Sequence, residues 1–319
     1  MNEDASGAVD RVARELGGMD VIERLAALSG SEFTSVMLEV VRRRAARETP
    51  ASVLRRYTQD RFVRPGSSWP GGASWRSGRR AEELLLGCLP AEVEVVTLAP
   101  LVPLGTHSVL GTVSQHKVVT AIRACEVAAD PTNALALEAA VRRRARPAAG
   151  TVRLAAIARV VRAQQFQAGW SAHFSLLGMV TSGRDEGSGR FERAALAEHL
   201  HFAVAGLRAA GLTQVQLALT PLSEAGEQIL ALVGAELAAL PAEIVTDDDR
   251  VTGRGYYRDV CFKVNALVDG TATEIGDGGF TDWTAKLLGN GKERALISGH
   301  GLDRIAGLID DRAARTSSG

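Results

Sequence analysis

The end of the chain constrains the fold more than any other segment. A glycine-rich stretch at residues 274–282 precedes an apolar strand that begins near Ala295. The strand runs through small residues into a helix that carries Arg304 at its start. Glycines let the backbone approach a phosphate closely, and a helix N-terminus with an arginine supplies positive field. This pattern predicts a strand-to-helix turn that receives an anionic ligand.

Apolar runs elsewhere predict a sheet whose strands follow one another closely. Strands are expected at residues 152–161, 172–180, 215–219 and 260–264. Short loops join neighbouring strands, which favours antiparallel pairing because parallel strands need a long crossover connection. Helices are expected at residues 80–86, 133–144 and 191–210, the last ended by Gly211. The sequence therefore predicts an α/β (α+β) fold, an antiparallel sheet flanked by helices.

The first part of the chain is expected to be helical and separate from the sheet. Asp20 with Glu23 forms a candidate capping box at a helix start. A stretch rich in proline, glycine and serine at residues 65–79 predicts a linker. We therefore divide the chain into an N-terminal helical region with its linker, residues 1–79, and a core domain, residues 80–319.

A run of arginines lies within this helical region. Between Arg42 and Arg64 there are eight arginines, with Glu48 and Asp60 as the acidic residues among them. We prefer a solvated helix face, in which the arginine stems lie on apolar residues and the charges remain in water. A surface that faces nucleic acid is the alternative. A nucleic-acid partner is left open and is not predicted.

Charge and cysteine content exclude several classes of protein. The 37 basic and 37 acidic residues give zero net charge, so no global field attracts nucleic acid or an anionic membrane. Cys88, Cys125 and Cys261 form no CxxC pair, so no metal-ligating residues are predicted. Neither a signal peptide nor a membrane span is found in the sequence. We expect a cytoplasmic protein without a membrane partner.

Residues 151–178 resemble motif 2 of the class II aminoacyl-tRNA synthetases. That motif is a strand ending in Arg-x-Glu, a loop, and a return strand that opens near a phenylalanine; here Arg162, Gln164 and Phe174 correspond. The resemblance implies that Arg162 faces the α-phosphate of ATP, where charge builds during attack by a carboxylate. It also implies that Phe174 and Gln164, which replaces the glutamate, contact the nucleotide. His173 is either a further base contact or a partly buried histidine bonded to backbone.

The helix start near the end of the chain resembles motif 3 of the histidyl type. Gly301-Leu-Asp-Arg304 is similar to Gly-Leu-Glu-Arg, so Arg304 is expected to bind the distal phosphates of ATP. Glu274 and Asp277 stand where Mg²⁺ bridging the phosphates could be held, or they belong to a solvated turn. The cofactors implied are ATP and Mg²⁺.

Three segments resemble the amino-acid-binding parts of the same family. Residues 253–263 look like the Arg-Gly-Leu-Asp-Tyr-Tyr strand, and two glycines fall on the Gly-Gly turn. Asp130-Pro-Thr132 resembles Glu-Gly-Thr, which holds the substrate α-amino group, although both residues could simply cap the following helix. The resemblance implies substrate contacts by Asp130, Thr132, Tyr256, Tyr257, Gly278 and Gly279.

Departures at the substrate-reading positions make histidine an unexpected substrate. Aligning on the two tyrosines puts Thr252 at the catalytic arginine of the histidyl branch, and Arg254 is the nearest substitute. The polar residues that read histidine fall on Leu176 and Val180, which are expected to line the substrate pocket. A site cannot keep a hydrogen-bonding specificity once its polar groups are lost. These changes predict a less polar side-chain pocket.

The expected function is ATP-dependent activation, by adenylation, of an amino-acid-like carboxylate other than histidine. The changes at Thr252 and Gln164 support an alternative, a non-catalytic protein resembling the regulatory subunit of ATP phosphoribosyltransferase. The chain ends shortly after Arg304, so no anticodon-binding domain is expected. A homodimer is expected through the motif 1 region, which we place at residues 91–105.

Overall fold

The computed structural model describes residues 3–60, 62–66, 72–146, 150–166 and 170–317. The chain divides into two compact units, Met1–Asp60 with Thr120–Cys125, and Arg61–Val119 with Glu126–Gly319. The division falls before the predicted linker. The linker prediction is wrong for residues 75–79, because α5 (Trp75–Leu86) already begins at Trp75; residues 67–71 of the predicted linker lie outside the described residues. This helix packs against α11 (Leu302–Ser317), within the second unit.

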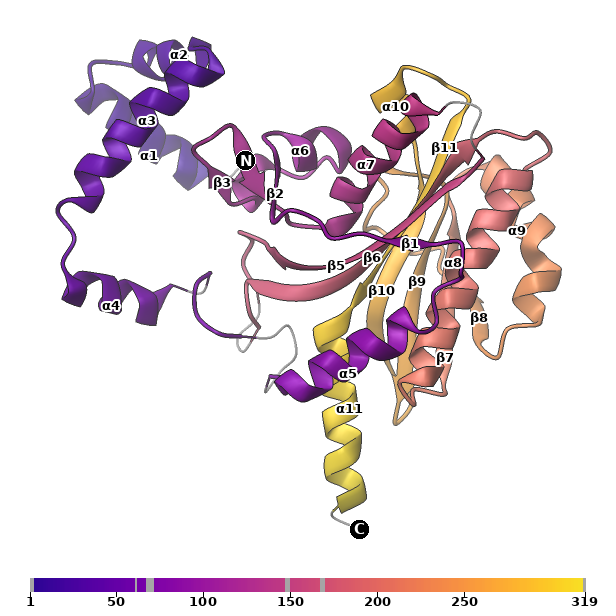
Figure 1. The fold of residues 1–319 in the computed structure, drawn as a ribbon. Helices are drawn as coiled ribbons and strands as arrows, with labels where there is room; N and C mark the ends of the chain where they lie inside the picture. The colour runs from indigo at the N-terminus through magenta and orange to yellow at the C-terminus, as the bar shows by residue number, and fades with distance from the viewer. Residues whose placement is uncertain (1–2, 61, 67–71, 147–149, 167–169, 318–319) are drawn as a thin grey trace. The chain divides into compact units, whose positions relative to one another are not determined.

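The first unit is helical, as the sequence predicts. It contains α1 (Glu3–Glu15), α2 (Asp20–Ala27), α3 (Gly30–Ala45) and α4 (Pro50–Gln59), drawn in indigo in Figure 1. The prediction of a capping box at Asp20 and Glu23 is wrong, because Asp20 is already the first residue of α2. A capping box forms instead at the start of α3, where Ser29 and Glu32 exchange hydrogen bonds.

The arginines of α3 lie on an exposed helix face. Arg42 and Arg43 form ion pairs with Glu39, at 2.7 and 2.8 Å, and both side chains are largely in water. This exposure agrees with the solvated face that we preferred. Exposed ion pairs at this spacing contribute only about 0.3–0.5 kcal/mol to stability.

The second unit is built on an eight-stranded sheet. Its central strands are antiparallel, and the two edge strands β1 and β8 pair in parallel with their neighbours. The order across the sheet is β1 (Glu94–Val95), β5 (Val152–Val161), β6 (His173–Arg184), β11 (Glu293–Gly301), β10 (Thr271–Thr281), β9 (Tyr257–Val268), β7 (Val215–Pro221) and β8 (Glu243–Thr246).

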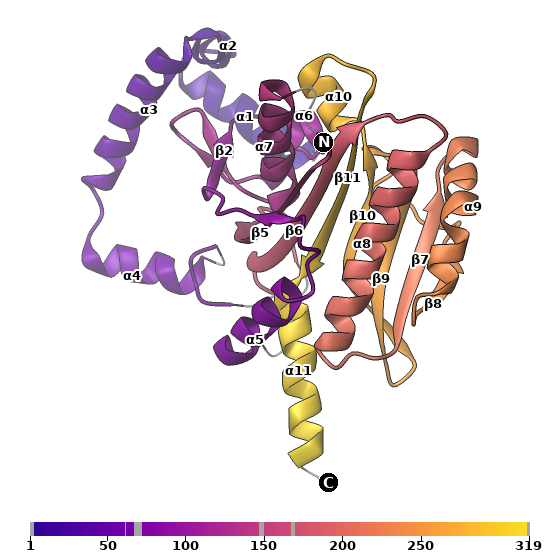
Figure 2. The ribbon, with the colours of Figure 1, turned by 45° about the vertical axis from the view of Figure 1, so that its right-hand side comes forward.

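Helices cover both faces of this sheet (Figure 1 and, turned by 45°, Figure 2). One face carries α5, α8 (Arg190–Ala209), α9 (Glu224–Ala238) and α11. The other carries α6 (Thr106–Leu110), α7 (Pro131–Ala145) and α10 (Trp283–Leu288). The apolar stripe predicted on α8 is confirmed, because Leu196, Leu200, Val204 and Leu207 are all buried.

Short elements occupy the segment between β1 and α7. They are β2 (Leu101–Pro103), α6, a 3₁₀ turn (Gln115–Lys117), β3 (Thr120–Ala121) and β4 (Cys125–Val127). Within the ranges described, no helix is both long and apolar enough to cross a membrane.

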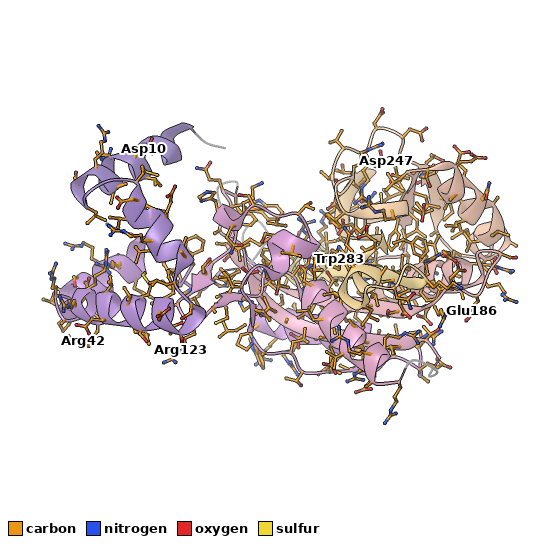
Figure 3. All side chains as sticks on the ribbon, turned by 90° about the horizontal axis from the view of Figure 1, so that it is seen from above. Asp10, Arg42, Arg123, Glu186, Asp247 and Trp283 are labelled. Carbon is orange, nitrogen blue, oxygen red and sulfur yellow. The ribbon has the colours of Figure 1, made fainter. Side chains whose placement is uncertain are left out.

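Strand alternation decides which side chains reach each face. Leu177 and Met179 of β6 pack in the cluster under α8, whereas Val180 packs with α7 on the opposite side. Phe174 and Leu176 share the α7 side with Val180, because side chains two apart on a strand point the same way. Trp283 lies among packed side chains of this unit, and Glu186 lies at its periphery (Figure 3).

Candidate functional site

Two adjoining cavities lie on the α7 side of the sheet. The larger, about 380 Å³, is lined by residues that include Trp170, Phe174, Glu274 and Arg304. The smaller, about 170 Å³, is lined by residues that include Asn133, Tyr256 and Trp283. Both are lined by Asp130, Arg162, Gln164, Asp277 and Gly299. The shared residues make the two cavities parts of one candidate site.

A larger hollow of about 960 Å³ is lined by residues of α8 and α9 but by none of the predicted site residues. Its arginines are already neutralised by ion pairs. Arg258 pairs with Asp282 at 2.8 Å, and Arg294 pairs with Asp185 and Glu192, each at 2.9 Å. Size alone therefore does not make it the functional site.

Arg162 is held in a fixed position at the boundary of the two cavities. It follows β5, and its backbone N–H donates to the carbonyl of Ala172 at 2.8 Å. Its Nε donates to the carbonyl of Ala129 at 2.9 Å, and a terminal nitrogen donates to Asp130 Oδ2 at 3.2 Å. The guanidinium lies 5.1 Å from the ring centre of Phe174, within cation–π range.

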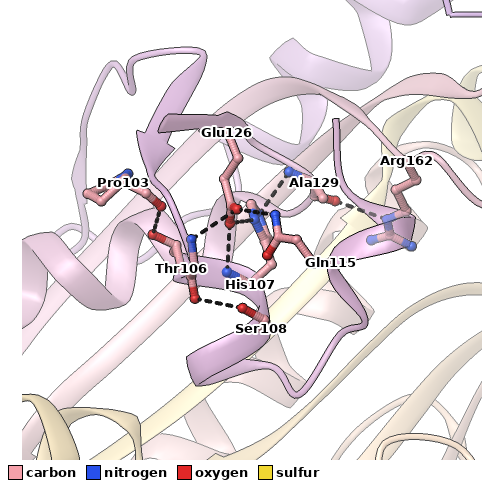
Figure 4. A network of polar contacts seen from close by, with 9 residues as sticks. Pro103, Thr106, His107, Ser108, Gln115, Glu126, Ala129 and Arg162 are labelled. Atoms are coloured by element: carbon pink, nitrogen blue, oxygen red, sulfur yellow. Dashed lines mark hydrogen bonds and ion pairs between the residues drawn. The ribbon is translucent and has the colours of Figure 1, made fainter. Parts of the chain in front are cut away.

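The Ala129 peptide that holds Arg162 is itself anchored by a buried histidine (Figure 4). The N–H of Ala129 donates to His107 Nε2 at 2.9 Å, and His107 Nδ1 lies 2.6 Å from Glu126 Oε1. Because Nε2 accepts a hydrogen bond, the ring proton is assigned to Nδ1, which donates to Glu126. A chain of hydrogen bonds thus runs from Glu126 through His107 and Ala129 to Arg162.

Glu126 can stay ionised in the interior because four donors surround it. Besides the His107 ring, they are the backbone N–H groups of Gly105 and His107, at 3.0 and 2.9 Å, and the Gln115 amide at 2.7 Å. Burial alone would raise the pKa of Glu126, but these hydrogen bonds outweigh it and lower that pKa. Gly105 adopts a φ of +87°, which a glycine tolerates without strain.

Arg304 lines the larger cavity, where its ion pair with Glu274 is long. It donates to the backbone carbonyl of Glu274 at 2.5 Å, whereas the carboxylate of that residue is 3.8 Å away. Its guanidinium lies 5.3 Å from the ring centre of Trp170. Burial lowers the pKa of Arg304, and the positive charge of Arg162 acts in the same direction, whereas the carboxylates of Glu274 and Asp277 oppose the shift. The two guanidinium groups therefore interact and together favour an anion between them.

Arg250 and Tyr257 hold the carboxylate of Asp277 in place. Arg250 is only 2% exposed, and it donates to Asp277 Oδ2 at 3.0 Å and to the carbonyl of Thr252 at 2.9 Å. The hydroxyl of Tyr257 donates to the same carboxylate oxygen at 3.1 Å. Burial raises the pKa of Asp277, and Arg250 partly opposes that shift. Sequence reasoning missed Arg250, because it stands in an acidic run with no motif around it.

Most of the predicted residues line the two cavities. The structure brings together Asp130, Thr132, Arg162, Gln164, Phe174, Leu176, Tyr256, Tyr257, Glu274 and Arg304. Asp130 has the capping role of the two considered for it. It caps α7, accepting from the N–H and hydroxyl of Thr132 at 2.9 and 2.7 Å, and it also contacts Arg162.

Two polar residues predicted for the site lie elsewhere. Arg254 is exposed and donates to the backbone carbonyls of Arg250 and Asp248, within its own loop. His173 accepts from Arg159 at 2.9 Å and lies 2.5 Å from the carbonyl of Arg64. It precedes Phe174 by one residue, so strand alternation turns it to the opposite face of the sheet. This is the backbone-bonded histidine of the two alternatives.

Three further predicted residues are packing residues of the sheet. Val180 is fully buried in the cluster beneath α7 and lines neither cavity. At Gly278 an added Cβ would lie 2.4 Å from the Phe262 ring, and at Gly279 it would lie 2.6 Å from the Tyr257 ring. These glycines are therefore required by close packing of the sheet.

Comparison with known proteins shows the fold. No protein-family model matches the chain, and no curated protein matches it. Among solved structures, an ATP phosphoribosyltransferase regulatory subunit/histidyl-tRNA synthetase from Bacillus halodurans C is 14% identical with a TM-score of 0.58, covering 78% of this chain and 83% of that one.

Two further solved structures are similar to a comparable extent. A histidine–tRNA ligase subunit from Alicyclobacillus acidocaldarius is 14% identical with a TM-score of 0.57, covering 79% of this chain and 99% of that one. The histidyl-tRNA synthetase of S. aureus is 15% identical with a TM-score of 0.55, covering 75% and 66%. The class II synthetase-like fold predicted from the motifs is confirmed.

Proposed function

We propose that the chain binds ATP and activates an amino-acid-like carboxylate by adenylation. One observation carries this proposal. Arg162 and Arg304 line the same cavity of about 380 Å³, and Arg304 is partly buried there, with the nearest carboxylate oxygen that of Glu274 at 3.8 Å. Two neighbouring guanidinium groups favour an anionic partner, and their planar shape suits phosphate oxygens.

The remaining lining residues fit a nucleotide. Phe166, Trp170 and Phe174 give the cavity an aromatic side on which a base can stack, and the Gln164 amide can donate and accept hydrogen bonds. The phosphates would lie towards Arg304, with the α-phosphate near Arg162 at the junction of the cavities. This places the reacting phosphorus beside the smaller cavity, where a second substrate can reach it.

The chemistry is the attack of a carboxylate oxygen on the α-phosphorus of ATP. The bond from that phosphorus to the bridging oxygen breaks, pyrophosphate leaves, and an acyl-adenylate forms. Charge develops on the α-phosphate oxygens in the transition state, where the Arg162 guanidinium stabilises it. Ala129 and Asp130 hold Arg162 beforehand, so little reorganisation is needed at that moment.

Mg²⁺ fits this site as a partner of the phosphates. Among the described residues, no three His, Cys, Asp or Glu side chains gather as a metal site. Mg²⁺ commonly uses one or two carboxylates together with phosphate oxygens and water. Glu274, which is half exposed in the larger cavity, and Asp277 beside it are the carboxylates that would hold the ion. The ion would neutralise charge on the leaving pyrophosphate.

The test is calorimetry of Mg²⁺-ATP binding to the full chain. Arg304→Ala removes a charge-assisted contact worth about 1.5–3 kcal/mol, so affinity should fall roughly 10- to 150-fold. Arg315→Ala is the matched control, because it removes an arginine of the same helix that is exposed and pairs with Asp269. No binding by the wild-type chain, or equal affinities for both variants, would refute the proposal.

A non-catalytic regulatory protein remains the second candidate. It is favoured by the position of Arg254, which bonds carbonyls of its own loop and leaves Thr252 without an arginine substitute in the cavities. One of the similar structures is named as a regulatory subunit of ATP phosphoribosyltransferase. ATP binding without amino-acid-dependent pyrophosphate exchange, together with co-purification of a phosphoribosyltransferase, would decide for this candidate.

We also propose that the chain forms a homodimer through residues 91–105. This segment includes the edge strand β1, and it exposes Val95, Leu101 and Leu104. An edge strand and exposed apolar side chains each favour pairing with another surface. Sedimentation of the wild-type chain should give a dimer, and Val95→Asp should shift it to monomer.

A further inference from the structure

The smaller cavity is lined by two buried side chains whose donors have no partner. Asn133, in the first turn of α7, is 4% exposed, and its Nδ2 makes no hydrogen bond within the described structure. Trp283, the first residue of α10, is 2% exposed, and its Nε1 is likewise unpaired there. Both residues line the cavity of about 170 Å³.

Unpaired buried donors call for an explanation, because almost all buried polar groups in native proteins have a partner. Here two donors from separate helices border one small cavity. Neither group can accept a hydrogen bond, since an amide nitrogen and an indole N–H only donate. The missing partner is therefore an acceptor atom.

The other walls of the cavity limit what can carry that acceptor. Val113, Tyr256 and Ile297 give it an apolar lining, and Lys117 adds a positive charge. A volume of about 170 Å³ leaves room for a short chain rather than a large ring. The chemistry favours a compact group that ends in a carbonyl or carboxylate oxygen.

The residues shared with the larger cavity orient such a substrate. Arg162 would face its reacting carboxylate and the α-phosphate, and Asp130 and Asp277 would face its amino group. The side chain would then extend away from ATP into the smaller cavity. The side-chain pocket proposed here is not the less polar pocket predicted at Leu176 and Val180. Leu176 lines the larger cavity, and Val180 lines neither cavity.

We propose, on the basis of the adenylation function, that the substrate is an amino acid with a short acceptor-bearing side chain. Aspartate, asparagine, glutamate and glutamine form this class. Asn133 and Trp283 determine the specificity by donating to the terminal oxygen of that side chain. A purely aliphatic side chain would leave both donors unpaired, and buried groups that stay unpaired discriminate strongly against such an analogue.

The experiment is ATP–pyrophosphate exchange with a panel of amino acids, using the full chain. We expect stimulation by at least one of the four named amino acids and at least tenfold less by leucine, valine or phenylalanine. Trp283→Phe keeps the ring and removes the N–H, and Asn133→Leu keeps the approximate size. Each should raise the KM for the amino acid at least tenfold and leave the affinity for ATP nearly unchanged.

Trp75→Phe is the matched control, because Trp75 is 78% exposed and lines neither cavity of the site. Thermal unfolding verifies that each variant is folded, so a misfolded Trp283→Phe leaves Asn133→Leu as the test. Stimulation by an aliphatic amino acid alone, or a KM unaffected by both variants, overturns the inference.

Calorimetry with the four amino acids in the absence of ATP separates this inference from the function on which it rests. Binding of an amino acid without ATP binding would refute adenylation but retain the cavity assignment. Binding of ATP without binding of any of the four would refute the assignment and leave the nucleotide site intact.

Discussion

Replacing the buried histidine that anchors Ala129 gives a sharp test of the site. In His107→Phe the aromatic ring remains, but Glu126 loses one donor and the Ala129 N–H loses its acceptor. Losing a hydrogen bond to a charged group costs about 1.5–3 kcal/mol, and leaving a buried donor unpaired costs about 1–3 kcal/mol. The free energy of unfolding should therefore fall by about 2.5–6 kcal/mol.

The same substitution should weaken ATP binding at a distance. Once its N–H is released, the Ala129 peptide no longer holds its carbonyl against Arg162 Nε. Arg162 then has to be ordered by the ligand, at a cost of about 1.4 kcal/mol or roughly tenfold in affinity. His107 lines the smaller cavity and not the larger one proposed for ATP, so an effect on ATP binding would pass through Ala129.

Urea unfolding and Mg²⁺-ATP calorimetry on the same preparations measure the two effects. His116→Phe is the control, because His116 is an exposed histidine on the neighbouring 3₁₀ turn. Surface substitutions of that kind usually change stability by less than about 0.5 kcal/mol. If His107→Phe matched the control in both measurements, the hydrogen-bond chain would have no role in stability or in binding.

Three further predictions concern the scaffold. Arg143→Ala leaves Glu293 buried without its partner at 2.9 Å, and the free energy of unfolding in urea should fall by about 3–5 kcal/mol. Arg142→Ala is the control: it breaks partly exposed ion pairs, so the free energy of unfolding should fall by about 1 kcal/mol or less. Gly278→Ala should lower the melting temperature through a loss of about 1–3 kcal/mol or more, because its Cβ would lie 2.5 Å from a backbone oxygen of β11. Burial lowers the pKa of His300 to about 4, so the folded protein keeps it neutral while the unfolded chain takes up a proton below about pH 6.5. Stability should therefore fall as the pH drops from about 6.5 to 4, and His300→Leu should flatten that fall in urea midpoints.

Local patterns in the sequence were enough to predict the strands and helices that form the site. The strand at residues 152–161 and the helix at 191–210 are recovered nearly to the residue. Apolar periodicity and capping act within a few residues, so one sequence carries them. Arg162 and Arg304 were found in the same way, because each follows a strand at a position that the motifs mark.

Long-range packing decided which other side chains reach the site. His173 and Phe174 are neighbours in the sequence, but the pleat of β6 sends one to each face of the sheet. Arg254 was expected in the site, yet the buried Arg250 holds the carboxylate of Asp277. A loop can fold back on its own carbonyls in many ways, and its local sequence does not distinguish among them.

The sequence by itself determined β5, β6 and α8 and marked the two arginines that line the larger cavity. Only the tertiary structure decided which residues hold Arg162 in place and which residues line the smaller cavity. Glu126, His107 and Arg162 form one chain through Ala129, and Asn133 and Trp283, 150 positions apart, border the same cavity. Hydrogen bonds and cavities between such distant residues depend on strand register and helix packing, which local propensity does not encode.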